Sequence, residues 1–159
     1  MGFQSVNEIN TFAFRDCELI SIERAGSGLR LEVEALIVEA ANSQNTNYTD
    51  SYAGTTIITL ENATIIKALE EGHRYYDAND RLLEEVPDRV MSEKETEELL
   101  KKCKPGCYLF GMVKEPETTD DLYVYSLGID VTETDSYWIY VSFTKAIFRW
   151  DRYMNRVQS

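Results

Sequence analysis

The sequence predicts an α+β domain, mainly an antiparallel β-sheet of about six to eight strands, with one main helix near residues 92–104. Three observations support this fold class. Hydrophobic and polar residues alternate over several segments, which is the periodicity of β-strands. Turn residues such as Gly, Asn and Asp separate these segments, and helix-capping residues flank only one of them. The length is that of a single domain, which we assign to residues 1–159.

The first two strands form a predicted hairpin. Cys17 to Arg24 is one strand, and Ala25-Gly26-Ser27-Gly28 is the turn that follows it. Leu29 to Glu39 is the second strand, because its residues alternate in polarity. A Gly-rich connection of four residues between two such segments favours antiparallel pairing. The face expected to be buried carries Leu29, Leu31, Val33, Ala35 and Ile37.

The middle of the chain alternates loops with short strands. Residues 42–52 contain no aliphatic side chain, and we expect an exposed loop there, named the polar loop below. Thr55 to Leu60 is a β-branched strand. Ala63 to Glu71 fits either a short helix or a strand, and its Thr-Ile-Ile segment favours the strand. Residues 74–83 predict a small hairpin with its turn at 77–80.

Ser92 to Lys104 is the predicted helix. Ser92 and Glu95 have the spacing of a capping box. Glutamates near the start and lysines near the end agree with the helix dipole, and Pro105-Gly106 ends the helix. The apolar residues are few, so we expect the helix to pack along one narrow stripe. That stripe consists of Leu99, Leu100 and Cys103.

Three further strands complete the predicted sheet, at Cys107 to Lys114, Leu122 to Val131 and Ser136 to Phe148. The connections between them are short and polar, so neighbouring strands should be antiparallel. The expected core consists of Phe12, Phe14, Leu19 or Ile20, Ile22, Leu31, Val33, Ile37, Ile57, Leu109, Leu127, Ile129, Ile139, Val141, Phe143 and Ile147.

Charge and cysteine content exclude several classes of function. The formal net charge of −12 argues against nucleic acids and anionic membranes as partners, because both require a basic surface. The N-terminus lacks the features of a signal peptide, and no apolar run is long enough to span a bilayer. Three cysteines without a secretory signal favour a cytoplasmic protein with reduced thiols.

Metal, cofactor and nucleophilic sites find little support in the sequence. A zinc site would need Cys103 and Cys107 together with Cys17 and His73, but Pro105-Gly106 between the first two is explained as a helix end. We therefore expect no metal site, and the absence of a Gly-rich phosphate motif gives no reason to expect a cofactor. His73 is the only imidazole and no nucleophile motif accompanies it, so we assign no catalytic residue.

Acidic and aromatic residues provide the strongest functional signal. Between Glu70 and Glu98 the chain has eleven acidic and four basic residues, a net charge of −7. Such a segment would steer a basic partner. Tyrosines in or beside loops offer large contact areas, and the C-terminal strands carry two alternating aromatic sets, one of which can face outward. The candidate binding residues are Tyr48, Asp50 and Tyr52 in the polar loop, and Tyr75, Tyr76 and Asp77 in the acidic segment.

The segment Thr11-Phe12-Ala13-Phe14-Arg15-Asp16-Cys17, followed by a strand, a short Gly turn and a second strand, resembles the opening of small acidic bacterial proteins of an uncharacterised family. It is also similar to the opening of some immunity proteins of bacterial polymorphic-toxin systems, which carry a Phe-x-Phe-His-Asp-like segment there. Arg15 stands here in place of their His. The similarity covers about the first forty residues. It implies a non-enzymatic cytosolic protein that binds another protein.

The leading hypothesis is therefore a non-enzymatic cytosolic binding protein whose acidic surface engages a basic protein partner, in an immunity-like role. A second hypothesis is a small-ligand-binding β-sheet domain with a pocket between the sheet and the helix. A third is a hydrolase that uses paired carboxylates, Asp16 with Asp151 or another acid.

Overall fold

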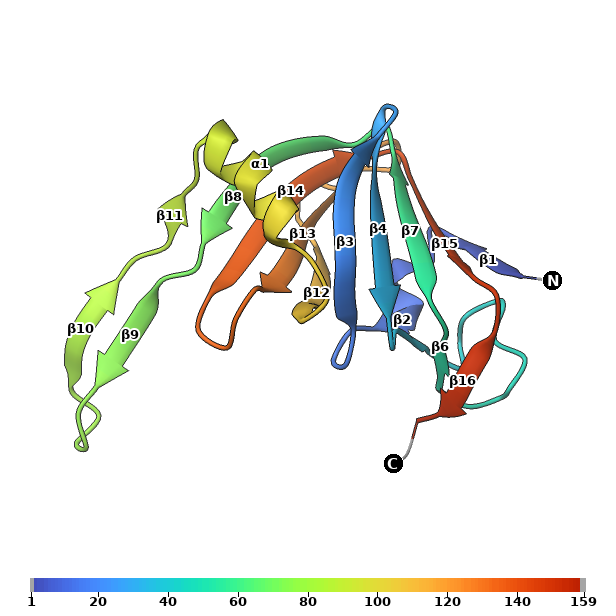
Figure 1. Ribbon diagram of the computed structural model, residues 1–159, viewed down its shortest axis with the longest axis horizontal. Helices are drawn as coiled ribbons and strands as arrows, with labels where there is room; N and C mark the ends of the chain where they lie inside the picture. The colour runs from blue at the N-terminus through green and yellow to red at the C-terminus, as the bar shows by residue number, and fades with distance from the viewer. Residues whose placement is uncertain (1, 158–159) are drawn as a thin grey trace.

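One antiparallel sheet of ten strands forms the body of the protein and curves around the core (Figure 1). The computed structural model describes residues 2–157. From edge to edge the strands are β1 (Phe3–Val6), β15 (Lys145–Trp150), β7 (Thr56–Glu61), β4 (Gly28–Glu34), β3 (Glu18–Ala25), β12 (Cys107–Lys114), β13 (Tyr123–Asp130), β14 (Ser136–Phe143), β8 (Thr64–Glu70) and β11 (Arg89–Val90).

Two smaller antiparallel sheets extend this body. One contains only β9 (His73–Tyr76) and β10 (Leu82–Val86). The other has four short strands, and the 3-10 helix η1 (Ile9–Thr11) precedes one of them. The order of these four strands is β16 (Tyr153–Arg156), β6 (Ser51–Ala53), β5 (Ile37–Val38) and β2 (Phe12–Ala13).

The predicted strand number was too low. The described residues contain sixteen strands and not six to eight, although the structure is mostly antiparallel sheet with one α-helix, as predicted. Strands of two residues, such as β2 and β5, are too short for an alternating pattern to reveal them. In addition, two segments that were predicted as single strands are each divided into two.

The first division lies at Ala35. The predicted strand from Leu29 to Glu39 ends at Glu34, and Ala35 has a left-handed backbone with φ of 57°. The chain bends there and enters the four-stranded sheet as β5. Ala35 therefore does not continue the buried face of β4, and the three residues from Leu36 to Val38 are all buried.

We expect Ala35→Gly to stabilise the protein. A left-handed conformation costs an L-residue with a Cβ atom roughly 1–2 kcal/mol, whereas glycine adopts it readily. After the larger unfolded-state entropy of glycine is included, the free energy of unfolding should rise by about 0.5–1 kcal/mol in urea titrations. Ala63→Gly is the control, because Ala63 is not among the positive-φ residues and should gain nothing. A loss of stability in Ala35→Gly would contradict the assigned backbone.

The second division lies at Thr144. The predicted strand from Ser136 to Phe148 consists of β14 and β15, which lie in different halves of the ten-stranded sheet. β14 pairs with β13 and β8, whereas β15 pairs with β1 and β7. The Thr144 N–H donates to the Glu61 carbonyl at 2.9 Å and fixes the point where the chain crosses between the halves.

The helix α1 (Glu93–Lys102) lies where the two halves of the sheet diverge. β3 and β12 share only two residue pairs at the start of β3, and β3 also contacts α1, where Arg24 donates to Glu97. The capping box of Ser92 and Glu95 is present, as predicted. Leu99, Leu100 and Cys103 are buried in the core. The helix thus covers the part of β3 that β12 leaves unpaired.

Inward-facing side chains of both halves form one hydrophobic cluster. The predicted core is confirmed at every position except Ile57, which is half-buried, while Leu19 rather than Ile20 is the buried member of that pair. Ile58 takes the expected place of Ile57, because the other face of β7 points inward. The segment that fitted a helix or a strand is the strand β8.

Candidate functional site

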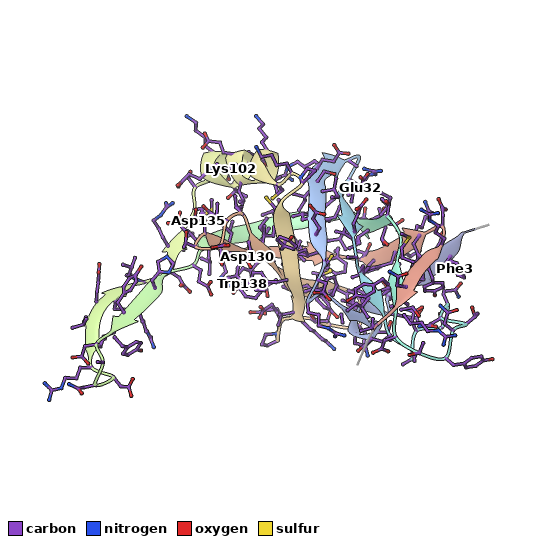
Figure 2. The ribbon with its side chains drawn as sticks, turned by 60° about the horizontal axis from the view of Figure 1, so that its bottom comes forward. Phe3, Glu32, Lys102, Asp130, Asp135 and Trp138 are labelled. Atoms are coloured by element: carbon purple, nitrogen blue, oxygen red, sulfur yellow. The ribbon has the colours of Figure 1, made fainter. Side chains whose placement is uncertain are left out.

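A two-stranded hairpin projects from one end of the sheet, away from the body (Figures 1 and 2). We name it the arm and define it as residues 73–86, which comprise β9, β10 and their turn. β10 pairs only with β9, and every residue of both strands is exposed. No residue of the arm belongs to the hydrophobic cluster of the body. The predicted hairpin therefore exists, but no second layer of structure packs on it.

Apolar side chains occupy both faces of the arm. Tyr76 pairs with Leu82, so these two side chains share one face. Neighbouring residues alternate between faces, which places Tyr75 and Val86 on the other face. Leu83 lies at an irregularity in the pairing and is 68% exposed. The arm therefore has no polar face that would be suited to water alone.

Polar contacts within the arm fix its shape. The carboxylate of Asp77 accepts the backbone N–H groups of Asn79 at 2.8 Å and Arg81 at 3.0 Å, which closes the turn at the tip. Across the strands, the Arg74 guanidinium donates to the Glu85 carboxylate at 3.1 Å. The candidate residue Asp77 thus shapes the tip, while Tyr75 and Tyr76 are the candidates with free surface, 51% and 53% exposed.

The base of the arm is a break in the β-ladder. A Cβ atom on Gly72 would lie 1.9 Å from the Val86 carbonyl oxygen, so only glycine fits at this position. The Gly72 N–H donates to the Asp88 carboxylate at 2.7 Å, and Pro87 has no N–H to contribute. Beyond this break the ladder resumes where β11 pairs with β8.

Arg89 links the base of the arm to the helix α1 through hydrogen bonds. Its guanidinium donates two hydrogen bonds to the Glu95 carboxylate, at 2.7 and 3.0 Å, and a third to Glu70 at 3.2 Å. Glu95 also accepts the Ser92 N–H at 3.0 Å. The hydrogen bonds from Arg89, followed by that from Ser92, lower the pKa of Glu95 to about 2.

This arrangement predicts a pH dependence at the base of the arm. The pKa of Glu95 is lowered on folding, so its contribution to stability is present above pH 4.5 and is lost as the pH falls towards 2. An NMR titration of the side-chain carboxyl should give a pKa near 2 in the wild type and a clearly higher pKa in Arg89→Gln. Arg74→Gln, which removes a guanidinium from the arm, should leave the value unchanged. A wild-type pKa near 4.5 would contradict the interaction.

The arm and its base are acidic. Residues 70–90 carry seven acidic and three basic residues, a net charge of −4. Two of the three arginines form ion pairs, Arg74 with Glu85 and Arg89 with Glu70 and Glu95. The remaining carboxylates of this segment are therefore largely uncompensated.

The polar loop is held in place by asparagine side chains. The amide of Asn42 is buried and donates to the hydroxyls of Ser5 at 3.0 Å and Thr11 at 2.8 Å. The Asn45 amide donates to the Thr49 carbonyl at 3.0 Å. The predicted loop is therefore present at residues 42–50, where its asparagines serve its own structure, but Ser51 and Tyr52 belong to the strand β6.

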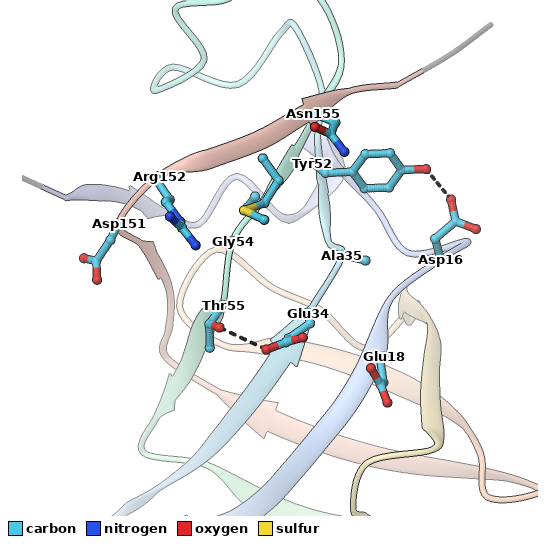
Figure 3. Close-up of a pocket in the computed structure, with 12 residues that line it drawn as sticks. Asp16, Glu18, Glu34, Ala35, Tyr52, Gly54, Thr55, Asp151, Arg152 and Asn155 are labelled. Atoms are coloured by element: carbon cyan, nitrogen blue, oxygen red, sulfur yellow. Dashed lines mark hydrogen bonds between the residues drawn. The ribbon is translucent and has the colours of Figure 1, made fainter.

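The three candidate residues of the polar loop have different environments. Tyr48 is 94% exposed. Asp50 accepts the Ala40 N–H at 2.9 Å and so closes the loop. The Tyr52 hydroxyl donates to the Asp16 carboxylate at 2.6 Å, beside a pocket (Figure 3), and this hydrogen bond raises the pKa of Tyr52. Tyr48 is therefore the only one of the three with a free side chain.

The structure does not bring the two groups of candidate residues together. Figure 1 shows the arm with Tyr75, Tyr76 and Asp77 at one end of the longest axis, and the polar loop near the opposite end. A partner of ordinary size would contact them separately.

One aromatic set of the C-terminal strands faces outward. Trp138 lies on the side of the sheet opposite the helix (Figure 2), whereas Tyr137 points into the core. The Phe110 ring packs on Trp138 with centroids 5.0 Å apart and covers Gly128. Lys67 lies over the Tyr140 ring at 4.6 Å. The outward rings thus cover one another and offer less free surface than the arm.

The pocket expected between sheet and helix is modest. A depression of about 380 Å³ lies between β8 and α1 and is lined by residues such as Ile65, Met91 and Thr96. A larger cavity of about 600 Å³ lies beside Tyr52. Asp16 and Asp151, the proposed hydrolytic pair, both line this larger cavity, but Figure 3 shows them on opposite sides, with Asp16 bound by Tyr52.

The four residues considered for zinc do not meet. Cys17, Cys103 and Cys107 are buried free thiols, whereas His73 lies on the exposed arm. Burial raises the pKa of Cys17, and it raises the pKa of Cys103 to about 12. Within residues 2–157 no three His, Cys, Asp or Glu side chains are grouped so that they could hold a metal ion.

Sequence reasoning missed two features of these surfaces. The larger cavity draws residues from four segments of the chain, and Arg89 joins three elements. For the contacts of Arg89, the only local indication in the sequence was the capping box that contains its partner Glu95.

Comparison of the chain with protein-family models, with curated proteins and with solved structures finds no match. The resemblance at residues 11–17 therefore stands on those residues alone. Two of them, Phe12 and Phe14, are core residues, and Phe12 stacks on Phe148 with centroids 4.1 Å apart. None of the helices among the described residues is long and apolar enough to cross a membrane.

Proposed function

We propose that the protein is a non-enzymatic binding protein whose arm engages a basic protein partner. The observation that carries the proposal is the exposure of apolar side chains on both faces of a hairpin that contributes nothing to the core. An isolated two-stranded hairpin is marginally stable in water, so the packing of the arm itself does not account for these side chains. A partner that covers the arm would bury them.

The composition of the arm suits a binding surface. Tyrosine provides a large contact area at a low cost in side-chain entropy, and tyrosines are enriched among the residues that dominate binding energy. Tyr75 and Tyr76 lie on opposite faces of the arm. The partner in this proposal therefore has a cleft that receives the hairpin, and not a flat surface that contacts one side.

The charge indicates the chemistry of the partner. Residues 70–90 carry a net charge of −4, and the whole chain carries −12. A basic surface would be attracted to the arm, and association would be fast and would weaken with salt. A second copy of this chain is disfavoured as the occupant, because two strongly acidic molecules repel each other.

The specific form of this proposal is an immunity-like role. The basic partner would be a toxin, and the arm would cover the surface that the toxin needs for its activity. The support for this form is the resemblance at residues 11–17 together with the acidic projecting hairpin.

The test is affinity capture from cells of the source organism with three baits. These are the wild type, Tyr75→Ser/Tyr76→Ser, and Tyr48→Ser, which serves as the control because Tyr48 is an even more exposed tyrosine in the polar loop. The expected result is a basic protein that the wild type and Tyr48→Ser retain at low ionic strength and release in high salt, and that the double variant does not retain.

Two outcomes would overturn the proposal. One is a specific partner that all three baits retain equally. The other is a partner that only Tyr48→Ser loses, which would move the site to the polar loop. Circular dichroism of the baits verifies that each is folded, and none of the substituted side chains belongs to the core.

A further inference from the structure

The larger cavity near Tyr52 has the size of a small-molecule site. Its volume is about 600 Å³, within the usual range for ligand pockets. It lies where β3 begins and β4 ends, and the segments after β6 and β15 complete its wall (Figure 3). The strands β6 and β16, which contribute to its wall, lie at the end opposite the arm in Figure 1, so a ligand there would be independent of the proposed protein partner.

The wall of the cavity contains one guanidinium group, that of Arg152. Within residues 2–157, Arg152 is the only basic residue that lines it. Among the described residues its side chain has neither a hydrogen bond nor an ion pair. A guanidinium presents donors in a planar fork that matches a carboxylate. Arg152 is therefore placed to receive an anionic group of a ligand.

The carboxylates of the wall retain free acceptor atoms. One oxygen of Asp16 accepts the Tyr52 hydroxyl, one of Glu18 accepts the Gly106 N–H at 2.9 Å, and one of Glu34 accepts the Thr55 hydroxyl at 3.1 Å. The second oxygen of each has no hydrogen-bond partner among residues 2–157. With Asp151, the lining contains four carboxylates and one guanidinium and so carries a net charge of −3.

The remaining wall is apolar. Met154 contributes its thioether, Tyr52 its ring, and Ala35 and Ala53 their methyl groups. Gly54 lies close to this wall, since a Cβ atom on it would be in van der Waals contact with Arg152 at 3.4 Å and with Met154 at 3.8 Å. An aliphatic chain fits this part of the wall better than a strongly hydrated group.

We propose that this cavity binds a basic α-amino acid. The ligand's carboxylate pairs with Arg152, its two cationic groups lie against the free carboxylate oxygens, and its aliphatic stem packs on Met154 and Tyr52. A neutral zwitterion leaves the net negative charge of the wall uncompensated, and a simple amine leaves Arg152 unpaired. A basic residue at the C-terminus of a peptide presents the same carboxylate, aliphatic stem and side-chain cation, but its α-nitrogen is an uncharged amide.

The test is isothermal titration calorimetry with four probes. L-arginine carries all the required groups, agmatine lacks the carboxylate, and L-citrulline lacks the side-chain charge. The peptide Gly-Gly-Arg presents the C-terminal form and distinguishes it from the free amino acid. We expect saturable binding of L-arginine or of Gly-Gly-Arg. The affinity for agmatine and for L-citrulline should be lower by about tenfold or more.

Matched variants locate the site. Arg152→Gln should reduce the affinity for L-arginine to that for agmatine and leave the affinity for agmatine unchanged. Glu34→Gln should reduce the affinity for both probes. Gly54→Leu should remove binding by filling the cavity. Arg156→Gln and Glu133→Gln change charge outside the cavity and should have no effect.

The proposal is overturned by three results: no saturable binding of any probe, equal binding of L-arginine, agmatine and L-citrulline, or undiminished binding in both Arg152→Gln and Gly54→Leu. Thermal unfolding of each variant is measured alongside. Because Arg152 is exposed, a folded Arg152→Gln protein is expected, and the charge-specific comparison holds even if Gly54→Leu fails to fold.

Discussion

Phe143→Ala is expected to lower the free energy of unfolding by about 3–5 kcal/mol, the range for a large aromatic residue removed from a core. Phe143 is fully buried at the end of β14. Its ring packs on Tyr123, its cross-strand partner, and on Tyr125, with both centroid distances at 5.6 Å. The substitution removes these contacts and leaves a cavity beside the bend at Thr144. Urea titration measures the change.

Ile66→Ala is the matched control for this prediction. Ile66 is 53% exposed on the neighbouring strand β8, so its truncation should change stability by less than about 0.5 kcal/mol. A loss below about 1 kcal/mol in Phe143→Ala would contradict the assigned register between β13 and β14.

Removal of the arm is expected to abolish partner binding and to leave the body folded. The arm joins the body only through its break at Gly72 and Pro87, and it contributes no residue to the core. Replacing residues 73–86 by a short Gly-Ser linker should therefore weaken binding to the captured partner by about a hundredfold or more. The midpoint of thermal unfolding of the body should be retained.

Substitutions that remove negative charge from the arm separate electrostatic steering of the partner from direct contact with the tyrosines. Asp80→Asn/Glu84→Gln keeps the tyrosines and the Arg74–Glu85 ion pair, and it should slow association and flatten its salt dependence, with a smaller loss of affinity than removal of the arm. Unfolding of the body after removal of the arm would show that the hairpin is structural. Full retention of binding would show that the arm is not the site.

The elements with local signals could be predicted from the sequence. The capping box of Ser92 and Glu95 lies within four residues and begins α1 as expected. β12 has the predicted bounds, because its alternation and the preceding Pro105-Gly106 are contiguous. The β-branched residues of β8 likewise favoured the strand that the structure contains.

The breaks could not be predicted because their causes lie far along the chain. Ala35 turns the chain so that β5 can pair with β6 and β2. Thr144 is fixed by Glu61, more than eighty residues earlier. The run around Ile57 and Ile58 allows either residue to face inward, and pairing with β4 and β15 selects Ile58.

The exposure of Tyr48, Tyr75 and Tyr76 could be predicted from the sequence, whereas the arrangement of the candidate residues could not. Tyr75 and Tyr76 are exposed on the arm, as a binding surface requires. The side chains of Asp50 and Asp77 close their own turns instead, which a polar sequence pattern does not distinguish from a free acid. The cavity has no local pattern, since three of its five charged residues, Asp16, Glu18 and Glu34, are far from Asp151 and Arg152 in the sequence.

Hydrogen–deuterium exchange of the free protein and of its complex with the captured basic partner tests the central claim most directly. In the free protein the amides of residues 73–86 should exchange rapidly, because no other structure covers the arm. In the complex these amides should become protected, while those of the polar loop keep their exchange rates. Equal exchange of residues 73–86 in both states, with new protection elsewhere on the body, would contradict the assignment of the arm as the binding site.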